Sequence, residues 1–197
     1  MTTHITHCVF VGTRLAFEGD LTSTALFVQA LDPSAQQSTI IFEVKGGREL
    51  DLDLRGSPEE VAERYPSPTV LTGEPDSPTA STPRKRGRPK LGVVGREITL
   101  LPRHWQWLDG QRGGASAALR RLIDEARKAR SGEDAVRRAQ LRTQQLLTAL
   151  TGNEPGFEEA LRALYSRDKA GFDSHIKGFP ADVLATAQRW AEDVFMV

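Results

Sequence analysis

The first 65 residues contain short β-forming stretches and one stretch with helical spacing. HCVFVG and RLAFEG predict two strands, and the pair Gly12 and Thr13 between them is a turn signal. The next stretch, DLTSTALFVQALD, has the apolar spacing of one helix and offers Asp20 or Thr22 as its N-cap. The chain therefore begins with a predicted hairpin followed by a helix.

Two further strands are predicted in TIIFEV and ELDLDL. Gly46 and Gly47 lie between them, and glycine readily takes the positive φ of a tight hairpin turn. In ELDLDL the leucines point to one face and the acidic residues to the other. The sequence SPEE, which starts at Ser57, is a capping box with proline at the first helical position, and its helix ends near Arg64. Residues 1–65 are therefore expected to form a small α+β domain in the order ββαββα.

Helical periodicity dominates the last hundred residues. REITLLP predicts a short strand that ends at Pro102, and two helices follow in RHWQWLDGQ and SAALRRLIDEARKA. Four more helices are expected, over residues 133–151, 156–166, 170–177 and 181–195. The pattern thus predicts a strand-helix-helix segment at 96–130 and a helical C-terminal region at 131–197.

Residues 66–95 differ in composition from both flanking parts. Residues 66–83 contain five prolines among serines and threonines, a composition that cannot supply a hydrophobic core. The basic run RKRGRPK follows directly at residues 84–90. The whole stretch is therefore expected to be a disordered linker.

Charge is distributed unevenly along the chain, although the formal net charge is zero. Residues 1–83 carry 5 basic and 12 acidic side chains, whereas residues 84–130 carry 13 basic and 4 acidic ones. Residues 131–197 carry 8 basic and 10 acidic side chains. Because a local field attracts partners of opposite charge, the cationic middle part favours a polyanionic partner.

Composition sets the expected compartment. Cys8 is the only cysteine, which excludes an internal disulfide framework and fits a reducing environment. No apolar run approaches the length that crosses a bilayer, and the first residues show no signal-peptide pattern. The sequence therefore predicts a cytoplasmic protein without a membrane partner.

The run RKRGRPK has the properties of a minor-groove ligand. The minor groove of B-DNA is only about 6 Å wide. Gly87 has no Cβ to strike its floor, Pro89 favours an extended backbone, and the side chains of Arg86 and Arg88 are expected to reach along A·T-rich DNA. The flanking basic residues are expected to contact phosphates: Arg84, Lys85 and Lys90. The run resembles the AT-hook motif, whose core is Arg-Gly-Arg-Pro. The alternative is a solvated basic linker without sequence preference.

The segment after the basic run resembles a ribbon-helix-helix domain, with the best match in SAALRRLIDEA. In that family two chains pair their strands into a ribbon that enters the major groove, so the resemblance implies a homodimer through residues 96–130. Arg96, Ile98 and Leu100 would lie in phase on one face of the strand, and Arg96 is a candidate DNA contact. Glu97 departs from the pattern. The alternative is a helical hairpin that leads into the C-terminal helices, with two tryptophans as its core and edge residues.

Most of the chain resembles one bacterial family of uncharacterised proteins. The likeness is closest over residues 87–129, from GRPKLGVVGREITLL to LIDEARKA, and extends to DLDLRGS and EPGFEEALRALY. This family is known as domain of unknown function 2239. The resemblance implies a bacterial cytoplasmic protein and brings no activity, cofactor or catalytic residue.

Other chemistry finds little support in the sequence. His4, His7 and Cys8 form HITHC, but the two histidines would lie on opposite faces of a strand, so no metal site is expected. His104 and His175 are isolated. The sequence contains no phosphate-binding glycine loop, HExxH or GxSxG motif, so no cofactor and no catalytic residue is predicted.

These observations favour a non-enzymatic DNA-binding protein, nucleoid-associated or regulatory, that contacts A·T-rich minor groove through RKRGRPK. Two other functions stay open. One is a protein-interaction adaptor with a solvated basic tether. The other is a small-molecule enzyme in the N-terminal domain, for which a deep polar pocket would be required.

Overall fold

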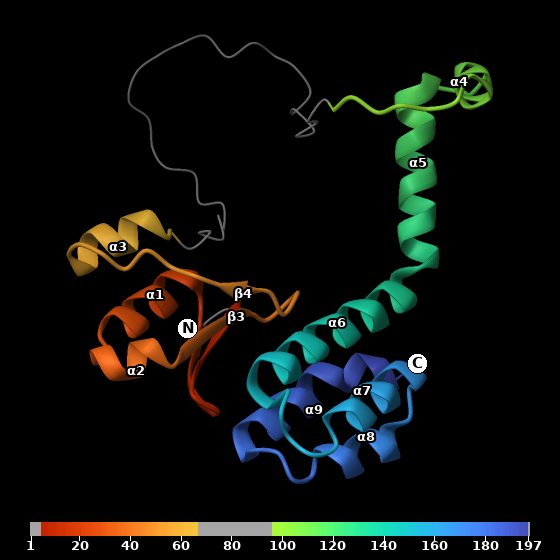
Figure 1. Ribbon diagram of the computed structural model, residues 1–197. Helices are drawn as coiled ribbons and strands as arrows, with labels where there is room; N and C mark the ends of the chain where they lie inside the picture. Colours follow the sequence, from red (N-terminus) through yellow and green to blue (C-terminus); the bar gives the residue numbers. More distant parts are fainter. Residues whose placement is uncertain (1–4, 67–95, 197) are drawn as a thin grey trace, which may run out of the picture. The chain divides into compact units, whose positions relative to one another are not determined.

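The computed structural model describes residues 5–66 and 96–196, which form two compact units (Figure 1). The first, here called the core unit, consists of residues 5–66 and 130–196. The second, here called the hairpin unit, contains the described residues 96–129. The predicted linker, apart from Pro66, lies outside the described residues.

A four-stranded antiparallel sheet lies at the centre of the core unit, with the strand order β2-β1-β3-β4. Its strands are β1 (His7–Val11), β2 (Arg14–Gly19), β3 (Thr39–Glu43) and β4 (Glu49–Leu50). Gly12 has a φ of 59° in the turn between β1 and β2, as the turn signal predicts. The first four residues of β1 are buried, so this strand is covered on both faces. The predicted α+β fold is confirmed.

Three short helices accompany the strands. They are α1 (Leu21–Gln29), α2 (Pro33–Gln37) and α3 (Pro58–Arg64). Asp20 caps α1, and the predicted capping box between Ser57 and Glu60 is present at the start of α3. The predicted order lacked α2. This helix has only five residues, so hydrophobic periodicity does not reveal it, although Asp32 caps it and Pro33 occupies its first turn.

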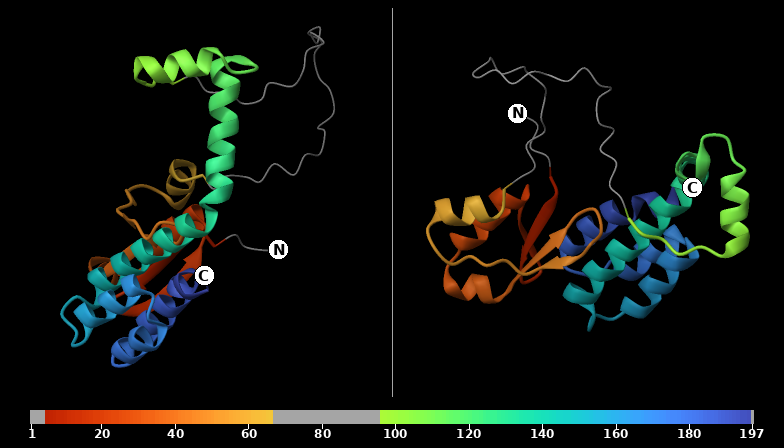
Figure 2. Two further views of the ribbon diagram at one scale, coloured as in Figure 1. Left: turned by 90° about the vertical axis from the view of Figure 1, so that its right-hand side faces the viewer. Right: turned by 90° about the horizontal axis from the view of Figure 1, so that it is seen from above.

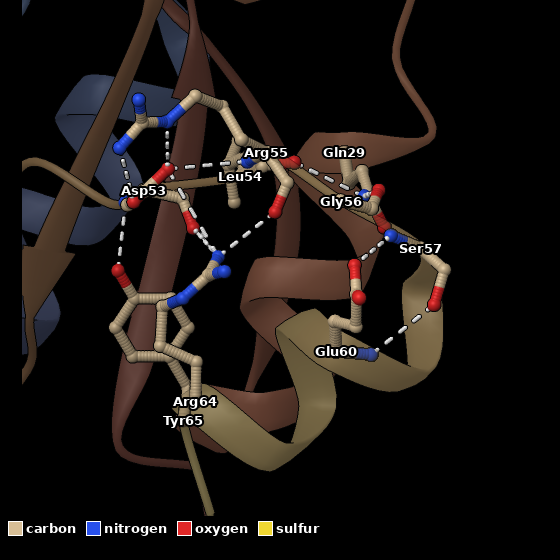
Figure 3. A network of polar contacts seen from close by, with 9 residues as sticks. All are labelled: Gln29, Asp53, Leu54, Arg55, Gly56, Ser57, Glu60, Arg64 and Tyr65. Atoms are coloured by element: carbon tan, nitrogen blue, oxygen red, sulfur yellow. Dashed lines mark hydrogen bonds and ion pairs between the residues drawn. The ribbon is translucent and has the colours of Figure 1, made fainter.

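The stretch ELDLDL pairs as a strand only over its first two residues, which corrects the predicted strand. Leu50, Leu52 and Leu54 nevertheless pack on one face of the sheet, as the alternation predicts. The chain leaves the sheet after Leu50, and side chains form hydrogen bonds to its backbone there (Figure 3). Their polar contacts are from Asp53 N to the Tyr65 hydroxyl at 2.7 Å, from Gln29 Nε2 to the carbonyls of Leu54 at 3.1 Å and Gly56 at 3.0 Å, and from Arg64 Nη1 to the carbonyl of Arg55 at 3.0 Å. These bonds replace the missing strand partner, because buried or half-buried backbone groups require one.

The C-terminal part of the core unit is helical, as predicted. Its helices are α6 (Ser131–Thr151), α7 (Phe157–Ser166), α8 (Lys169–Ile176) and α9 (Ala181–Phe195). The buried residues of α9 share one face of the helix: Val183, Thr186, Ala187, Trp190, Ala191 and Val194. Among the described helices, none combines the length and the apolar character that a membrane span requires.

These helices pack directly on the sheet and share its core. Cys8, Phe10 and Phe42 lie in one buried cluster with residues of α6 to α9. The Phe42 ring meets the Trp190 ring edge to face, with centroids 6.2 Å apart. On the opposite face of the sheet, Val9 packs in a second cluster with residues of α1 and β3. The core unit therefore has three layers, with α1 to α3 on one side of the sheet and α6 to α9 on the other (Figure 2).

The sequence predicts separate regions at residues 1–65 and 131–197, whereas the structure joins both segments in the core unit. Polar contacts reinforce this packing. The Leu15 amide donates to Asp182 Oδ2 at 3.0 Å, and Arg189 forms an ion pair with Glu18. The lack of alternation in HCVFV is the sequence signal of a strand covered on both faces, because each face then needs apolar side chains.

Two buried threonines of α6 provide a test of its packing. Thr143 is completely buried, and its hydroxyl has no hydrogen-bond partner among the described residues, whereas the Thr151 hydroxyl donates to the Leu147 carbonyl at 2.9 Å. Because an unpaired buried hydroxyl costs about 1–3 kcal/mol, Thr143→Val is expected to raise the free energy of unfolding by about 1 kcal/mol. The matched Thr151→Val is expected to lower it by about 0.5–1 kcal/mol. Chemical denaturation measures both, and equal changes in the two variants would contradict this assignment.

Candidate functional site

Most of the predicted DNA-binding residues lie outside the described residues, namely Arg84, Lys85, Arg86, Gly87, Arg88, Pro89 and Lys90. Arg96 is described and is exposed. The part of the predicted DNA-binding region that the structure describes is therefore the hairpin unit.

The hairpin unit consists of two helices, α4 (Pro102–Asp109) and α5 (Gly114–Ala129), both of which the sequence predicts. Gly113 and Gly114 have φ values of 87° and 75° in the turn between them. This backbone conformation suits glycine, because it has no Cβ. The turn lets α4 fold back against α5, where Leu108 and Ala118 are buried.

The predicted strand REITLLP is corrected by the structure, since residues 96–101 form no strand. A strand is stabilised by hydrogen bonds to a neighbouring strand, and none of the described strands pairs with this segment. In the ribbon-helix-helix pattern the pairing strand would come from a second chain. The ribbon therefore stays a prediction.

An apolar groove runs between α4 and α5, with a volume of about 260 Å³. Its lining residues come from both helices and from the segment before them: Leu100, His104, Trp107, Leu108, Leu119 and Leu122. Trp107 is 51% exposed, and Ile123, next to the groove on α5, is 54% exposed. The tryptophans were expected as core and edge residues, and both Trp105 and Trp107 lie at the exposed edge. The helical period of α5 predicted its apolar face, but not that α4 covers only part of it.

Exposed cations accompany this groove. Residues 96–129 contain seven basic and four acidic side chains. Among the described residues, no carboxylate forms an ion pair with Arg103, Arg112 or Arg121. Arg120 instead donates through Nε to the Ser116 carbonyl at 3.0 Å, within its own helix. The arginines of the hairpin unit thus present donors to an external anion.

No metal site is expected in HITHC, and its described residues His7 and Cys8 are buried in β1. Cys8 is buried in β1, and burial raises the pKa of its thiol to about 12, so a thiolate does not form at neutral pH. His7 is also buried, and Thr6 Oγ1 lies 2.8 Å from its Nδ1. His4 lies outside the described residues, and the described part of the chain holds no group of three or more potential metal ligands.

His7 makes the stability of the core unit depend on pH. Burial lowers the pKa of His7 below its ordinary value of 6.5, although Glu43 and Asp20 oppose this effect. The folded protein then binds fewer protons than the unfolded chain, so the free energy of unfolding is expected to fall as the pH drops below 6.5. Denaturation of the wild type and of His7→Gln at pH 7.5 and 5.5 measures this, with a larger loss expected for the wild type. Equal losses in the two proteins would assign the pH dependence to other groups.

Within the acidic face of residues 49–53, the Asp53 carboxylate is paired with neighbouring arginines. Arg55 binds the Asp53 carboxylate through Nε and Nη2, each at 2.8 Å, and this pairing holds the pKa of Asp53 well below its ordinary range (Figure 3). Two of the cavities among the described residues border residues 5–66. One, of about 520 Å³, is lined by Leu26, Gln29, Ala30 and Pro58. The other, of about 320 Å³, is lined by Ile5, Thr6, His7, Glu43, Val44 and Lys45.

The fold defines an α+β protein whose three-layer core unit is formed by two chain segments, with a basic helical hairpin between them in the sequence. The family model described as "Uncharacterized protein conserved in bacteria (DUF2239)" matches residues 6–191, so the chain belongs to this bacterial family. The resemblance to domain of unknown function 2239 is thereby confirmed. No curated protein and no solved structure matches the sequence.

Proposed function

We propose that this protein is a non-enzymatic DNA-binding protein, nucleoid-associated or regulatory. It would bind the minor groove of A·T-rich DNA through RKRGRPK. Arg86 and Arg88 would lie in the groove, and the basic residues beside them would bind phosphates. The observation that carries the proposal is the concentration of 13 basic against 4 acidic side chains in residues 84–130.

A single short basic run makes few phosphate contacts, and non-specific binding reaches only about 10⁻⁴ to 10⁻⁶ M at physiological salt. A second set of contacts would raise the affinity through effective concentration. The exposed arginines of the hairpin unit are suited to this role, because phosphate binding requires donors that are not already paired with carboxylates. The hairpin unit would therefore bind flanking phosphates while the basic run reads the groove.

Titration against A·T-rich and G·C-rich duplexes over a range of salt concentrations tests the proposal. The full chain is expected to bind the A·T-rich duplex more tightly, and its affinity should fall as salt rises. The control replaces residues 69–129 by a long Gly/Ser linker, which leaves both segments of the core unit in one chain. This variant is expected to stay folded and to lose binding. Equal affinity for both duplexes, or binding by the control, would contradict the proposal.

The apolar groove favours a second candidate function, a protein-interaction adaptor. A groove lined by Trp107 and leucines suits an apolar side chain of another protein. Partners that stay bound to the purified chain after nuclease treatment, and that are lost in Trp107→Ala, would support the adaptor.

A further inference from the structure

A pocket between α8 and α9 belongs to the core unit and takes no part in the proposed DNA contacts. Its volume is about 490 Å³, within the range of about 300–1,000 Å³ that is typical of small-molecule sites. Lys169, Phe172 and Asp173 line it from α8, where spacings of three and four residues place them on one side of the helix. The residues that line its other side belong to α9 and the position after it: Gln188, Arg189, Glu192, Phe195 and Met196. Two helices of one compact unit therefore form the pocket (Figure 1).

The apolar part of the pocket rests on the hydrophobic core. Phe172 is completely buried, and its ring lies against the Phe195 ring with the two centroids 5.6 Å apart. Phe195 is half-buried, and Met196 next to it is 70% exposed. A ligand that covers these two side chains removes their apolar surface from water, which favours binding. The pocket therefore suits a ligand with an apolar body.

Most of the charged groups at the pocket are already paired. The Asp173 carboxylate accepts hydrogen bonds from Lys169 Nζ at 2.5 Å and from Gln188 Nε2 at 3.0 Å. Arg189 Nη1 donates to Glu18 Oε2 at 3.2 Å, and a second bond from Nη2 makes this ion pair bidentate. Both cations among the lining residues thus hold a carboxylate, so an anionic ligand would have to displace one.

Glu192 is the charged lining residue without such a partner. Its side chain is exposed, and among the described residues no cation forms an ion pair with it. Gln188 lies four residues before it and Phe195 three residues after it, so all three share one side of α9. Two paired cations and three carboxylates leave one negative charge in excess at the pocket. This charge lies next to the apolar part that Phe195 forms.

We infer that this pocket binds a small organic cation, in which a primary ammonium group is joined to an apolar body. The ammonium group would lie beside Glu192 and the Phe195 ring, because a carboxylate and the face of an aromatic ring both attract a cation. The apolar body would cover Phe195 and Met196. A DNA phosphate does not suit the pocket, because Glu192 repels it. The inference is independent of DNA binding and gives the core unit a ligand of its own.

Amide NMR of the full-length protein at pH 7 tests the inference with 2-phenylethylamine, which is a cation at this pH. The matched probe is 2-phenylethanol, which keeps the ring and the chain length but carries no charge. The cation is expected to shift amide signals of α8 and α9 in a saturable titration. It is expected to bind about three- to five-fold more tightly than the alcohol, because its ammonium group gains an ion pair with an exposed carboxylate.

Two variants change the charge of the pocket in different ways. Glu192→Gln is expected to weaken binding of the cation about three- to five-fold and to leave binding of the alcohol unchanged. Met196→Lys places a like charge at the pocket, and because Met196 is 70% exposed the fold is expected to tolerate it. This variant is also expected to weaken binding of the cation. The matched control is Glu158→Gln, which removes an exposed carboxylate of α7 outside the pocket and is expected to bind both probes like the wild type.

The inference is overturned if the cation gives no saturable shift of α8 and α9, or if the wild type binds both probes equally well. A preference for the cation that survives in Glu192→Gln would overturn it too. The same spectra show whether each variant is folded, so loss of binding is separated from loss of structure. These titrations contain no DNA. Their failure would leave the DNA-binding proposal as it is, and a failed duplex titration would leave this inference as it is.

Discussion

Replacing Arg86 and Arg88 by alanine is expected to weaken binding to an A·T-rich duplex by about 10- to 100-fold. This loss corresponds to about 1.4–2.7 kcal/mol for the two arginines together, because both would be lost from a groove whose narrow A·T form enhances the negative potential. Binding to a G·C-rich duplex should fall by only a few-fold, because there the variant loses charge and no groove contact. Fluorescence anisotropy with both duplexes at one salt concentration measures the difference.

The matched control is Arg84→Ala with Lys85→Ala, which removes the same charge from the flank of the run. Affinity for the two duplexes is expected to fall equally. The slope of log affinity against log salt should become shallower by about 1.8, because each phosphate contact contributes about 0.9. If the two double variants behave alike, RKRGRPK is an undirected charge patch and the groove assignment fails.

Replacing Gly47 by alanine is expected to lower the free energy of unfolding by about 3 kcal/mol. Gly47 has a φ of 72°, and a Cβ there would lie 2.4 Å from the Cα of Arg142 on α6. The positive φ costs about 1–2 kcal/mol for a residue with a Cβ, and overpacking adds about 1–3 kcal/mol. The loss is attributed to the contact between the β3–β4 turn and α6, and chemical denaturation of the variant and the wild type measures it.

Gly12→Ala separates the two causes. Gly12 has a φ of 59° in the turn between β1 and β2, and no neighbouring atom lies within 4 Å of a Cβ placed there. This variant is expected to lose only the backbone contribution, about 1 kcal/mol. The excess loss in Gly47→Ala reports the close packing of the N-terminal segment on α6. Equal losses in both variants would contradict the shared core.

Local signals in the sequence predicted most of the individual elements. The helices of the C-terminal region begin and end within a few residues of their predicted bounds, because a helix buries one stripe at a fixed period. The SPEE capping box at Ser57 is present because its two hydrogen bonds involve neighbouring residues alone. The alternation in ELDLDL correctly placed its leucines inside.

Elements that depend on a partner were predicted less well. ELDLDL leaves the sheet after Leu50, because Tyr65, Gln29 and Arg64 bind the backbone of Asp53 and Leu54 in place of a strand. REITLLP has the alternation of a strand but no described strand to pair with. In both cases the side-chain pattern is local, whereas the hydrogen-bonding partner is distant in the sequence or lies in another chain.

The same difference between local signals and distant partners applies to the candidate site. The sequence identified the cationic region at residues 84–130 by its composition and the two helices after the basic run by their hydrophobic periodicity. It could not show that α4 covers only part of the apolar face of α5, because burial depends on where the neighbouring helix lies. The groove and the exposed Trp107 and Ile123 follow from that packing.

The sequence by itself determined the α+β class, the bacterial family, the order of the main helices and the position of the basic run. Periodicity, capping and charge act over a few residues, so they can be read along the chain. Only the tertiary structure decided that residues 5–66 and 130–196 form one core unit around β1. Phe10, Phe42 and Trp190 are apolar in any arrangement, and a pattern of apolar residues states that a face must be buried but not which distant segment buries it.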